Sequence, residues 1–185
     1  AFVADAYWLI LDQLTGARPH TYDLRYHLPA AALDAVDVAS IEHGWLVSAP
    51  GLALVVLGEV APRIEPGWVA PEYGVKHSAP VVSVRVEDVH DAQFVTLLAP
   101  HADGKAPPRV APDWHEDGWT AMVASGGVRD TVEWHRHDAT VGIADVRGAG
   151  RAAWSRVRGK QVEAAAVAGS SRWRSWSATA GRASG

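Results

Sequence analysis

Hydrophobic residues recur along this chain with a period of two, which is the pattern of a strand with one buried face. The stretch VVSVRVEDV shows the pattern most clearly. It places valines on one face and polar side chains on the other: Val82, Val84 and Val86 against Ser83, Arg85 and Glu87. Two short apolar runs, YWLIL and LALVVL, have the length of buried strands.

Turn residues separate the predicted strands and indicate hairpins. Ala49-Pro50-Gly51 joins two apolar segments, because proline presets φ and glycine permits positive φ. Gly126-Gly127 and Gly159-Lys160 are typical of tight hairpin turns. His90-Asp91-Ala92 predicts a further turn before the strand QFVTLLAP.

Many short strands at close spacing predict an all-β fold, an antiparallel β-sandwich, with a closed barrel as the alternative. The proline-rich stretches 61–74 and 99–118 are predicted to be loops, and 29–41 fits either a helix or a strand and loop. We expect one sandwich domain over residues 1–170 and a disordered basic tail over 171–185.

Composition removes several classes of function. The chain has no cysteine, so it has no disulfide, no thiolate zinc site and no cysteine nucleophile. Residues 151–185 carry seven basic side chains and one acidic one, whereas the other 150 residues carry 10 basic and 20 acidic ones. The acidic body argues against nucleic acid as a partner, and no apolar run is long enough for a membrane helix.

The stretch HTYDLRYHLP, residues 20–29, is the densest group of polar and aromatic side chains. In a strand, His20 falls on the face of Tyr22 and Tyr26, whereas His27 falls on the face of Asp23 and Arg25. The two histidines therefore cannot bind one metal ion. We expect the face with Asp23, Arg25 and His27 to contact a neighbouring strand or another domain.

VEWHRHD is a candidate metal site. Glu133, His135 and His137 alternate along a strand and fall on one face, and imidazole and carboxylate groups are common zinc and iron ligands. Alternate residues lie roughly 7 Å apart, which is long for three ligands of one ion. A solvated polar face is the competing interpretation.

Two aromatic clusters could bind a sugar by stacking, or could simply be buried anchors. The first cluster also offers possible proton-abstracting bases, and it comprises Trp68, Tyr73, Lys76 and His77. The second comprises Trp114, His115, Glu116, Asp117 and Trp119.

Several stretches, taken in order over residues 3–170, resemble the C-terminal β-sandwich of the heparinase II/III-like polysaccharide lyases. They are AYWLILDQLTG, HTYDLRYHL, GLALVVLG, GWVAPEYGVKHSAPVVSVRV and FVTLLAP. Within them, the spacing of Tyr7-Trp8 to Asp12, of His20-x-Tyr22 to His27-Leu28, and of Trp68 to Tyr73-Gly74 carries the resemblance.

The resemblance implies an enzyme with an N-terminal α/α toroid and this sandwich, which cleaves uronic-acid polysaccharides by β-elimination. It implies a periplasmic or secreted location, an acidic polysaccharide and the toroid as partners, and no nucleic acid or membrane. None of the family's catalytic or metal-binding residues maps onto this chain, which begins in mid-strand as a piece of a longer protein would.

On this view the chain has no catalytic residues, no metal and no cofactor of its own, and it supports the substrate cleft. The matching residues are expected to form the framework: Trp8 and Tyr22 by packing, Gly74 by turning, and Phe94 and Leu97 in the core. A non-catalytic carbohydrate-binding β-sandwich module is the alternative.

Overall fold

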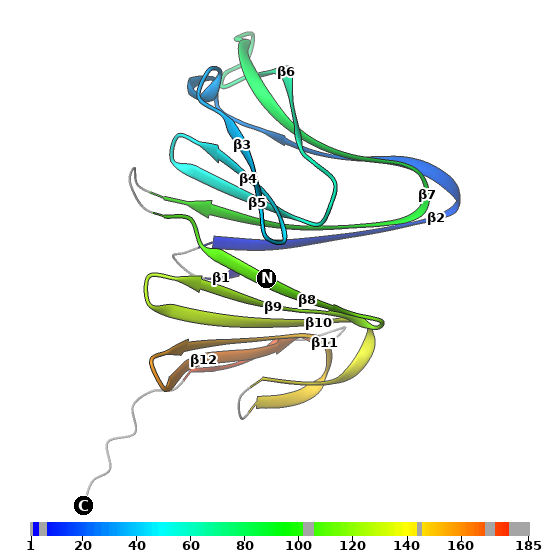
Figure 1. The fold of residues 1–185 in the computed structure, drawn as a ribbon, viewed down its shortest axis with the longest axis vertical. Coiled ribbons are helices and arrows are strands. Elements are labelled where there is room, and N and C mark those ends of the chain that lie inside the picture. Colours follow the sequence, from blue (N-terminus) through cyan, green and yellow to red (C-terminus); the bar gives the residue numbers. More distant parts are fainter. Residues whose placement is uncertain (1, 4–6, 102–105, 144–145, 169–172, 178–185) are drawn as a thin grey trace, which may run out of the picture. The chain divides into compact units, whose positions relative to one another are not determined.

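The computed structural model describes residues 2–3, 7–101, 106–143, 146–168 and 173–177. The chain divides into two compact units, 1–107 and 108–185, and each unit contains one antiparallel sheet. Apart from the 3-10 turn Ala30–Ala32, the regular elements of the described residues are strands (Figure 1). The all-β antiparallel fold predicted from the period-two pattern is confirmed.

The sheet of the first unit has the strand order β1-β2-β7-β5-β4-β3, and β6 also pairs with β7. Strands β1 to β7 span Phe2–Val3, Tyr7–His27, Asp37–Ile41, Gly44–Ala49, Leu52–Leu57, Arg63–Val69 and His77–Pro100. The ambiguous stretch 29–41 thus contains both a 3-10 turn and a strand. Pro50-Gly51 joins β4 to β5, with Gly51 at a φ of 73°, as the sequence predicted.

Strands β2 and β7 are unusually long and bend together, as Figure 1 shows at the right of the first unit. Their pairing is irregular between Thr15 and Tyr22, where Gly16 and Pro19 lie. A Cβ atom on Gly16 would lie 2.6 Å from the His20 ring, and Pro19 has no N–H to donate. The irregularity therefore falls where the His20 ring occupies the space left by Gly16 and where Pro19 has no N–H to donate to the β2–β7 ladder.

The bend folds one sheet into the two layers of a sandwich. Strand β6 pairs with residues 77–83 of β7, and β5 pairs with residues 95–100. One core cluster joins Val82 and Val84 from the first half of β7 to Phe94 from the second half and to Leu54 of β5. The predicted β-sandwich is thus built by a sheet that packs against itself.

The turn predicted at His90-Asp91-Ala92 is wrong, because β7 continues through these residues. The chain changes direction by a distortion of the strand instead, and Asp88 adopts a positive φ of 56°. Pairing with β2 on both sides of the bend keeps the backbone groups hydrogen-bonded, so no separate turn is needed.

A hydrogen bond links the two layers inside the sandwich. The Tyr26 hydroxyl of β2 lies 2.6 Å from the Thr96 hydroxyl of β7, and Thr96 is fully buried. Burial raises the pKa of Tyr26 above its usual 10.0, the bond to Thr96 opposes this rise, and the nearby Asp12 carboxylate adds to it.

Most of the expected framework residues do pack as predicted. Tyr22 contacts the core cluster, Phe94 and Leu97 are buried, and Gly74 has a φ of 77° in the β6–β7 loop. Trp8 differs, since 42% of its surface is exposed. It therefore does not belong to the core.

The second unit is a meander in which each strand pairs with the next, in the order β13-β12-β11-β10-β9-β8. Strands β8 to β13 span Arg109–His115, Gly118–Ser125, Val128–Ile143, Val146–Arg158, Gln161–Ala168 and Trp173–Ser177. The predicted hairpin turns at Gly126-Gly127 and Gly159-Lys160 are confirmed. Asp130, almost fully buried, accepts two hydrogen bonds from Arg156 across the β10–β11 pair, at 2.8 and 2.7 Å.

The two proline-rich stretches predicted to be loops each contain a strand, so that prediction is wrong in part. Strand β6 contains Pro66 and β8 contains Pro112, and each strand pairs on one side only. Proline is tolerated on such edge strands because an N–H that faces away from the partner is not needed for the ladder. Residues 102–105 of the second stretch lie outside the described residues.

The single domain predicted over residues 1–170 stays a prediction. Within the predicted tail, Trp173–Ser177 form β13 and pair with β12. Residues 171–172 and 178–185 of that tail lie outside the described residues.

The fully buried Leu54 should carry much of the stability of the first unit. Leu54→Ala removes side-chain volume from the core cluster, and we expect it to lower the free energy of unfolding by about 2–5 kcal/mol. Urea denaturation followed by circular dichroism measures this loss. The matched control is Leu33→Ala, because Leu33 is 48% exposed. Equal losses in the two variants would contradict the proposed core.

The raised pKa of Tyr26 predicts a dependence of stability on alkaline pH. The folded state holds the Tyr26 proton more tightly than the unfolded chain, so this contribution is complete below the unfolded pKa and is lost as pH rises through the folded pKa. As pH rises through the unfolded pKa of 10.0, the free energy of unfolding of Tyr26→Phe should fall less steeply than that of the wild type. Parallel curves in urea titrations would show that Tyr26 is not responsible.

Candidate functional site

The outward face of the β2 stretch around residues 23–27 contacts neighbouring strands, as the sequence predicted. Ser83 of β7 donates a hydrogen bond to Asp23 at 2.7 Å, and Arg25 bonds to Asp23 at 3.1 Å. Arg25 also reaches Glu65 of β6 at 2.5 Å. His27 lies 3.2 Å from the carbonyl oxygen of Trp68. This face is thus occupied by contacts within the sheet.

The short side chain of Ser83 makes the Arg25–Glu65 contact possible. Ser83 lies on β7, opposite Arg25 of β2 on one side and opposite Arg63 of β6 on the other. A long side chain at this central position would block the path across β7. The outer face is therefore a layer of charged side chains that span three strands.

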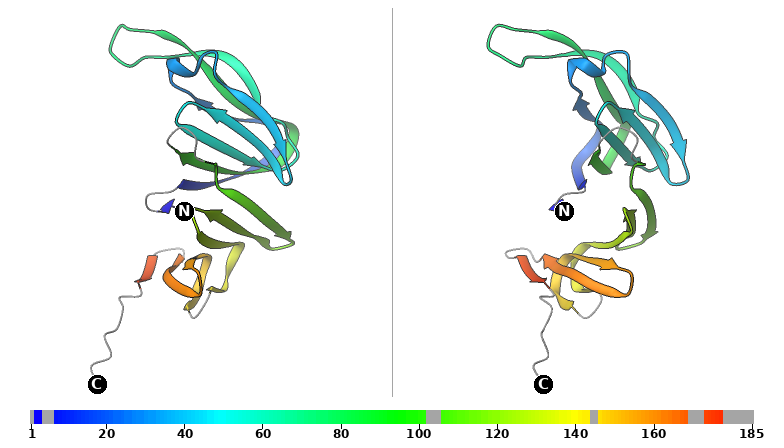
Figure 2. Two further views of the ribbon diagram at one scale, coloured as in Figure 1. Left: turned by 60° about the vertical axis from the view of Figure 1, so that its left-hand side comes forward. Right: turned by 90° about the vertical axis from the view of Figure 1, so that its left-hand side faces the viewer.

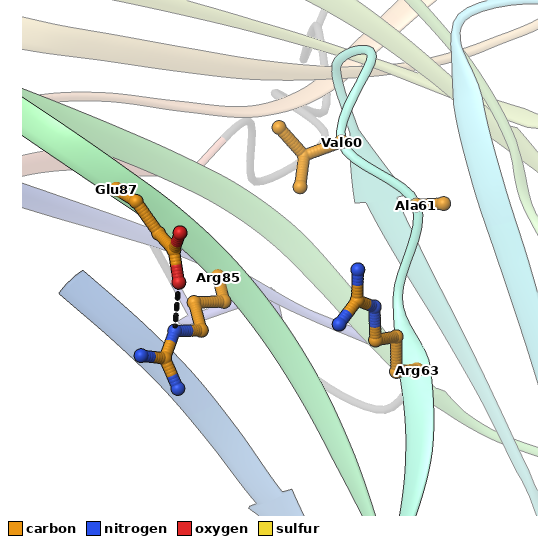
Figure 3. Close-up of a pocket in the computed structure, with 5 residues that line it drawn as sticks. All are labelled: Val60, Ala61, Arg63, Arg85 and Glu87. Atoms are coloured by element: carbon orange, nitrogen blue, oxygen red, sulfur yellow. Dashed lines mark ion pairs between the residues drawn. The ribbon is translucent and has the colours of Figure 1, made fainter. Parts of the chain in front are cut away.

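A pocket of about 350 Å³ opens beside this layer, where the loop from β5 to β6 passes close to β7. Val60 and Ala61 of the loop form one wall, and Arg63 begins β6. Arg85 and Glu87 of β7 form the opposite wall. Figure 3 shows Arg63 extending from its strand into the space that separates it from the Arg85–Glu87 pair.

The two arginines of the pocket differ in their partners. The Arg85 Nε atom lies 2.8 Å from a Glu87 carboxylate oxygen, which fixes the guanidinium against β7. Arg63 has no ion pair or side-chain hydrogen bond within the part of the chain that the structure describes. The pocket therefore offers one cation, Arg63, that has no partner among the described residues, and a second, Arg85, that is held in place.

The first aromatic cluster lies on the β6–β7 hairpin, which projects from the rest of its unit (Figure 2). The Lys76 ammonium lies 4.4 Å from the centre of the Trp68 ring, a cation–π contact, and Trp68 is 51% exposed. Tyr73 is fully exposed and His77 is exposed, and neither makes a described side-chain contact that would activate a base. Of the four residues in the predicted cluster, the structure thus brings Trp68 and Lys76 into contact.

The second aromatic cluster separates into a buried and an exposed part. Trp119 is only 2% exposed and stacks on Trp134 with 6.5 Å between ring centroids. Trp114 is 49% exposed, and His115, Glu116 and Asp117 are exposed around the β8–β9 turn. Only Trp114 of the two tryptophans could stack on a sugar.

The candidate metal ligands do not converge. Glu133 and His135 are in contact at 2.7 Å. His137 is exposed and lies within the segment between Trp134 and Ala139 where the β10–β11 register shifts. The ring of His115 lies 5.5 Å from that of His135. Among the described residues, no group of three His, Asp or Glu side chains could hold a metal ion.

The arginine pocket is the site that sequence reasoning missed. Alternation in VVSVRVEDV already places Arg85 and Glu87 on the outward face. The pairing of β6 with β7, which brings Arg63 to the same face, connects residues far apart in sequence and involves a stretch interpreted as a loop.

Comparison with known proteins is consistent with this fold. A search of curated proteins found no match. No helix of the described residues has the length and apolar character needed to span a membrane. The sequence of residues 1–96, just over half of the chain, matches the family described as heparinase II/III-like, C-terminal. This chain therefore belongs to the heparinase II/III-like, C-terminal family.

Proposed function

We propose that this chain is the β-sandwich portion of a polysaccharide lyase that cleaves uronic-acid polysaccharides by β-elimination. The observation that carries the proposal is the family match, which covers most of the first unit. In the whole enzyme, an N-terminal α/α toroid would supply the catalytic residues and the sandwich would support the substrate cleft. Such an enzyme would work in the periplasm or outside the cell.

The chemistry of β-elimination fits this division of labour. The reaction needs a group that neutralises the uronate carboxylate, a base that removes the C5 proton and an acid that protonates the leaving oxygen. In this chain, the Tyr22 hydroxyl donates a hydrogen bond to the His90 carbonyl oxygen and the Tyr26 hydroxyl is paired with Thr96. Both hydroxyls hold the fold, which favours a structural role for this portion.

The first test is a lyase assay on the purified 185-residue chain. With heparin or alginate as substrate, we expect no rise in the absorbance of unsaturated uronate, because on this proposal the toroid supplies the catalytic residues. The full product of the same gene, which we expect to encode a toroid upstream of Ala1, should release unsaturated uronate under the same conditions. Cleavage by the 185-residue chain alone would refute the proposed division of labour.

A second candidate function is a non-catalytic carbohydrate-binding module, and the Trp68–Lys76 contact favours it. An exposed indole ring can stack on the apolar face of a sugar, and an ammonium beside it can bind a uronate carboxylate. Both side chains are exposed, and they lie on the hairpin that projects from its unit in Figure 2.

Calorimetric titration of the chain with uronic-acid oligosaccharides tests this second function. If the hairpin binds glycan, Trp68→Ala should weaken binding by at least about threefold, as expected for the loss of an aromatic contact. Met122→Ala is the control, because Met122 of β9 is 48% exposed, close to the 51% of Trp68, and belongs to neither aromatic cluster. Unchanged affinity in Trp68→Ala would exclude the hairpin as the binding surface.

A further inference from the structure

We propose that the pocket between Arg63 and Arg85 binds a carboxylate or sulfate group of an acidic polysaccharide. The assignment of a polysaccharide rests on the proposed function, whereas the preference for an anion rests on the pocket itself. Both arginines and Glu87 line the same cavity of about 350 Å³, together with Val60 and Ala61.

The geometry of the cations suits an oxyanion that presents two oxygens side by side. A guanidinium presents N–H donors in a fixed fork that matches two oxygens of a carboxylate or sulfate. Glu87 engages the Nε atom of Arg85, so the two terminal nitrogens of Arg85 stay available for a ligand. Arg63, which extends into the space opposite, adds a second fork (Figure 3).

The neighbouring carboxylates do not fill the pocket, because each already has a partner. Glu65 is paired with Arg25, and Asp23 accepts bonds from Arg25 and Ser83. Glu87 is paired with Arg85. The charged surface side chains are thus balanced, with three arginines and three carboxylates: Arg25, Arg63, Arg85, Asp23, Glu65 and Glu87. Their contacts leave Arg63 without a partner among the described residues. An external anion would complete the set.

The remaining wall explains why a sugar acid fits better than a bare ion. Val60 and Ala61 present apolar surface beside the cations, and a uronate or sulfated sugar carries C–H groups next to its anionic group. The cavity volume lies at the lower end of the range for ligand sites, so it suits a single sugar residue of a longer chain.

Calorimetric titration of the full 185-residue chain with three probes tests the proposal. The probes are an oligomannuronate tetrasaccharide, which carries carboxylates only, a sulfated heparin tetrasaccharide and sodium sulfate. We expect at least one tetrasaccharide to bind, and Arg63→Gln and Arg85→Gln each to weaken that binding by about tenfold. Arg63→Lys should lose part of the affinity, because it keeps the charge but not the fork.

The matched control is Arg109→Gln, which removes an exposed arginine of β8 that does not line the pocket. Its affinity should equal that of the wild type, and thermal unfolding should show that all variants are folded. Wild-type affinity in Arg63→Gln would overturn the proposal, as would binding of sodium sulfate alone. Because the titration involves no turnover, such a result leaves the lyase assignment standing, and failure of the lyase assay leaves this binding test intact.

Discussion

The pairing of β2 with β7 on both sides of the bend is the constraint on which the first unit depends. These two strands stay hydrogen-bonded before and after the bend, so one ladder runs through both layers of the sandwich. An interrupted ladder would leave two separate edges and a row of unpaired backbone groups. The irregular segment near Gly16 and Pro19 concentrates the distortion in β2, and Asp88 absorbs it in β7. The core then forms between halves of the same sheet.

The same bend determines where the pocket with charged side chains forms. In the layer formed by residues 77–83 of β7, Val82 packs on the core, and Val81 and Ser83 on the opposite face are buried as well. The charged side chains of Arg25 and Glu65 meet over that opposite face. Strand β6 joins this layer only after the chain crosses from β5, and the crossing loop brings Val60 and Ala61 beside β7. A pocket at this crossing therefore follows from the topology. Its chemistry depends on which side chains the alternation of β6 and β7 turns outward, and these are arginines and a glutamate.

Local patterns in the sequence predict much of this fold, and they fail where distant residues decide. Alternation and glycine turns correctly predict β4, β5, β9, β10 and the hairpins that join them. The prolines of β6 and β8 suggested loops, because the sequence does not reveal which strands lie at an edge. His90-Asp91-Ala92 resembled a turn, but pairing with β2 keeps these residues in one strand. Both errors concern partners far apart in the chain.

The candidate sites follow the same rule. Residues in the same short segment seemed to form clusters, yet Trp119 is buried while Trp114 is exposed, and the register shift separates His137 from Glu133. By contrast, Arg63 and Arg85 are 22 positions apart in the sequence and line the same pocket because β6 pairs with β7. Arginines that pair with carboxylates on the same sheet are ordinary surface features and contribute little to stability. Arg63 is different, because among the described residues no ion pair within the sheet accounts for its place, whereas the proposed anionic ligand would.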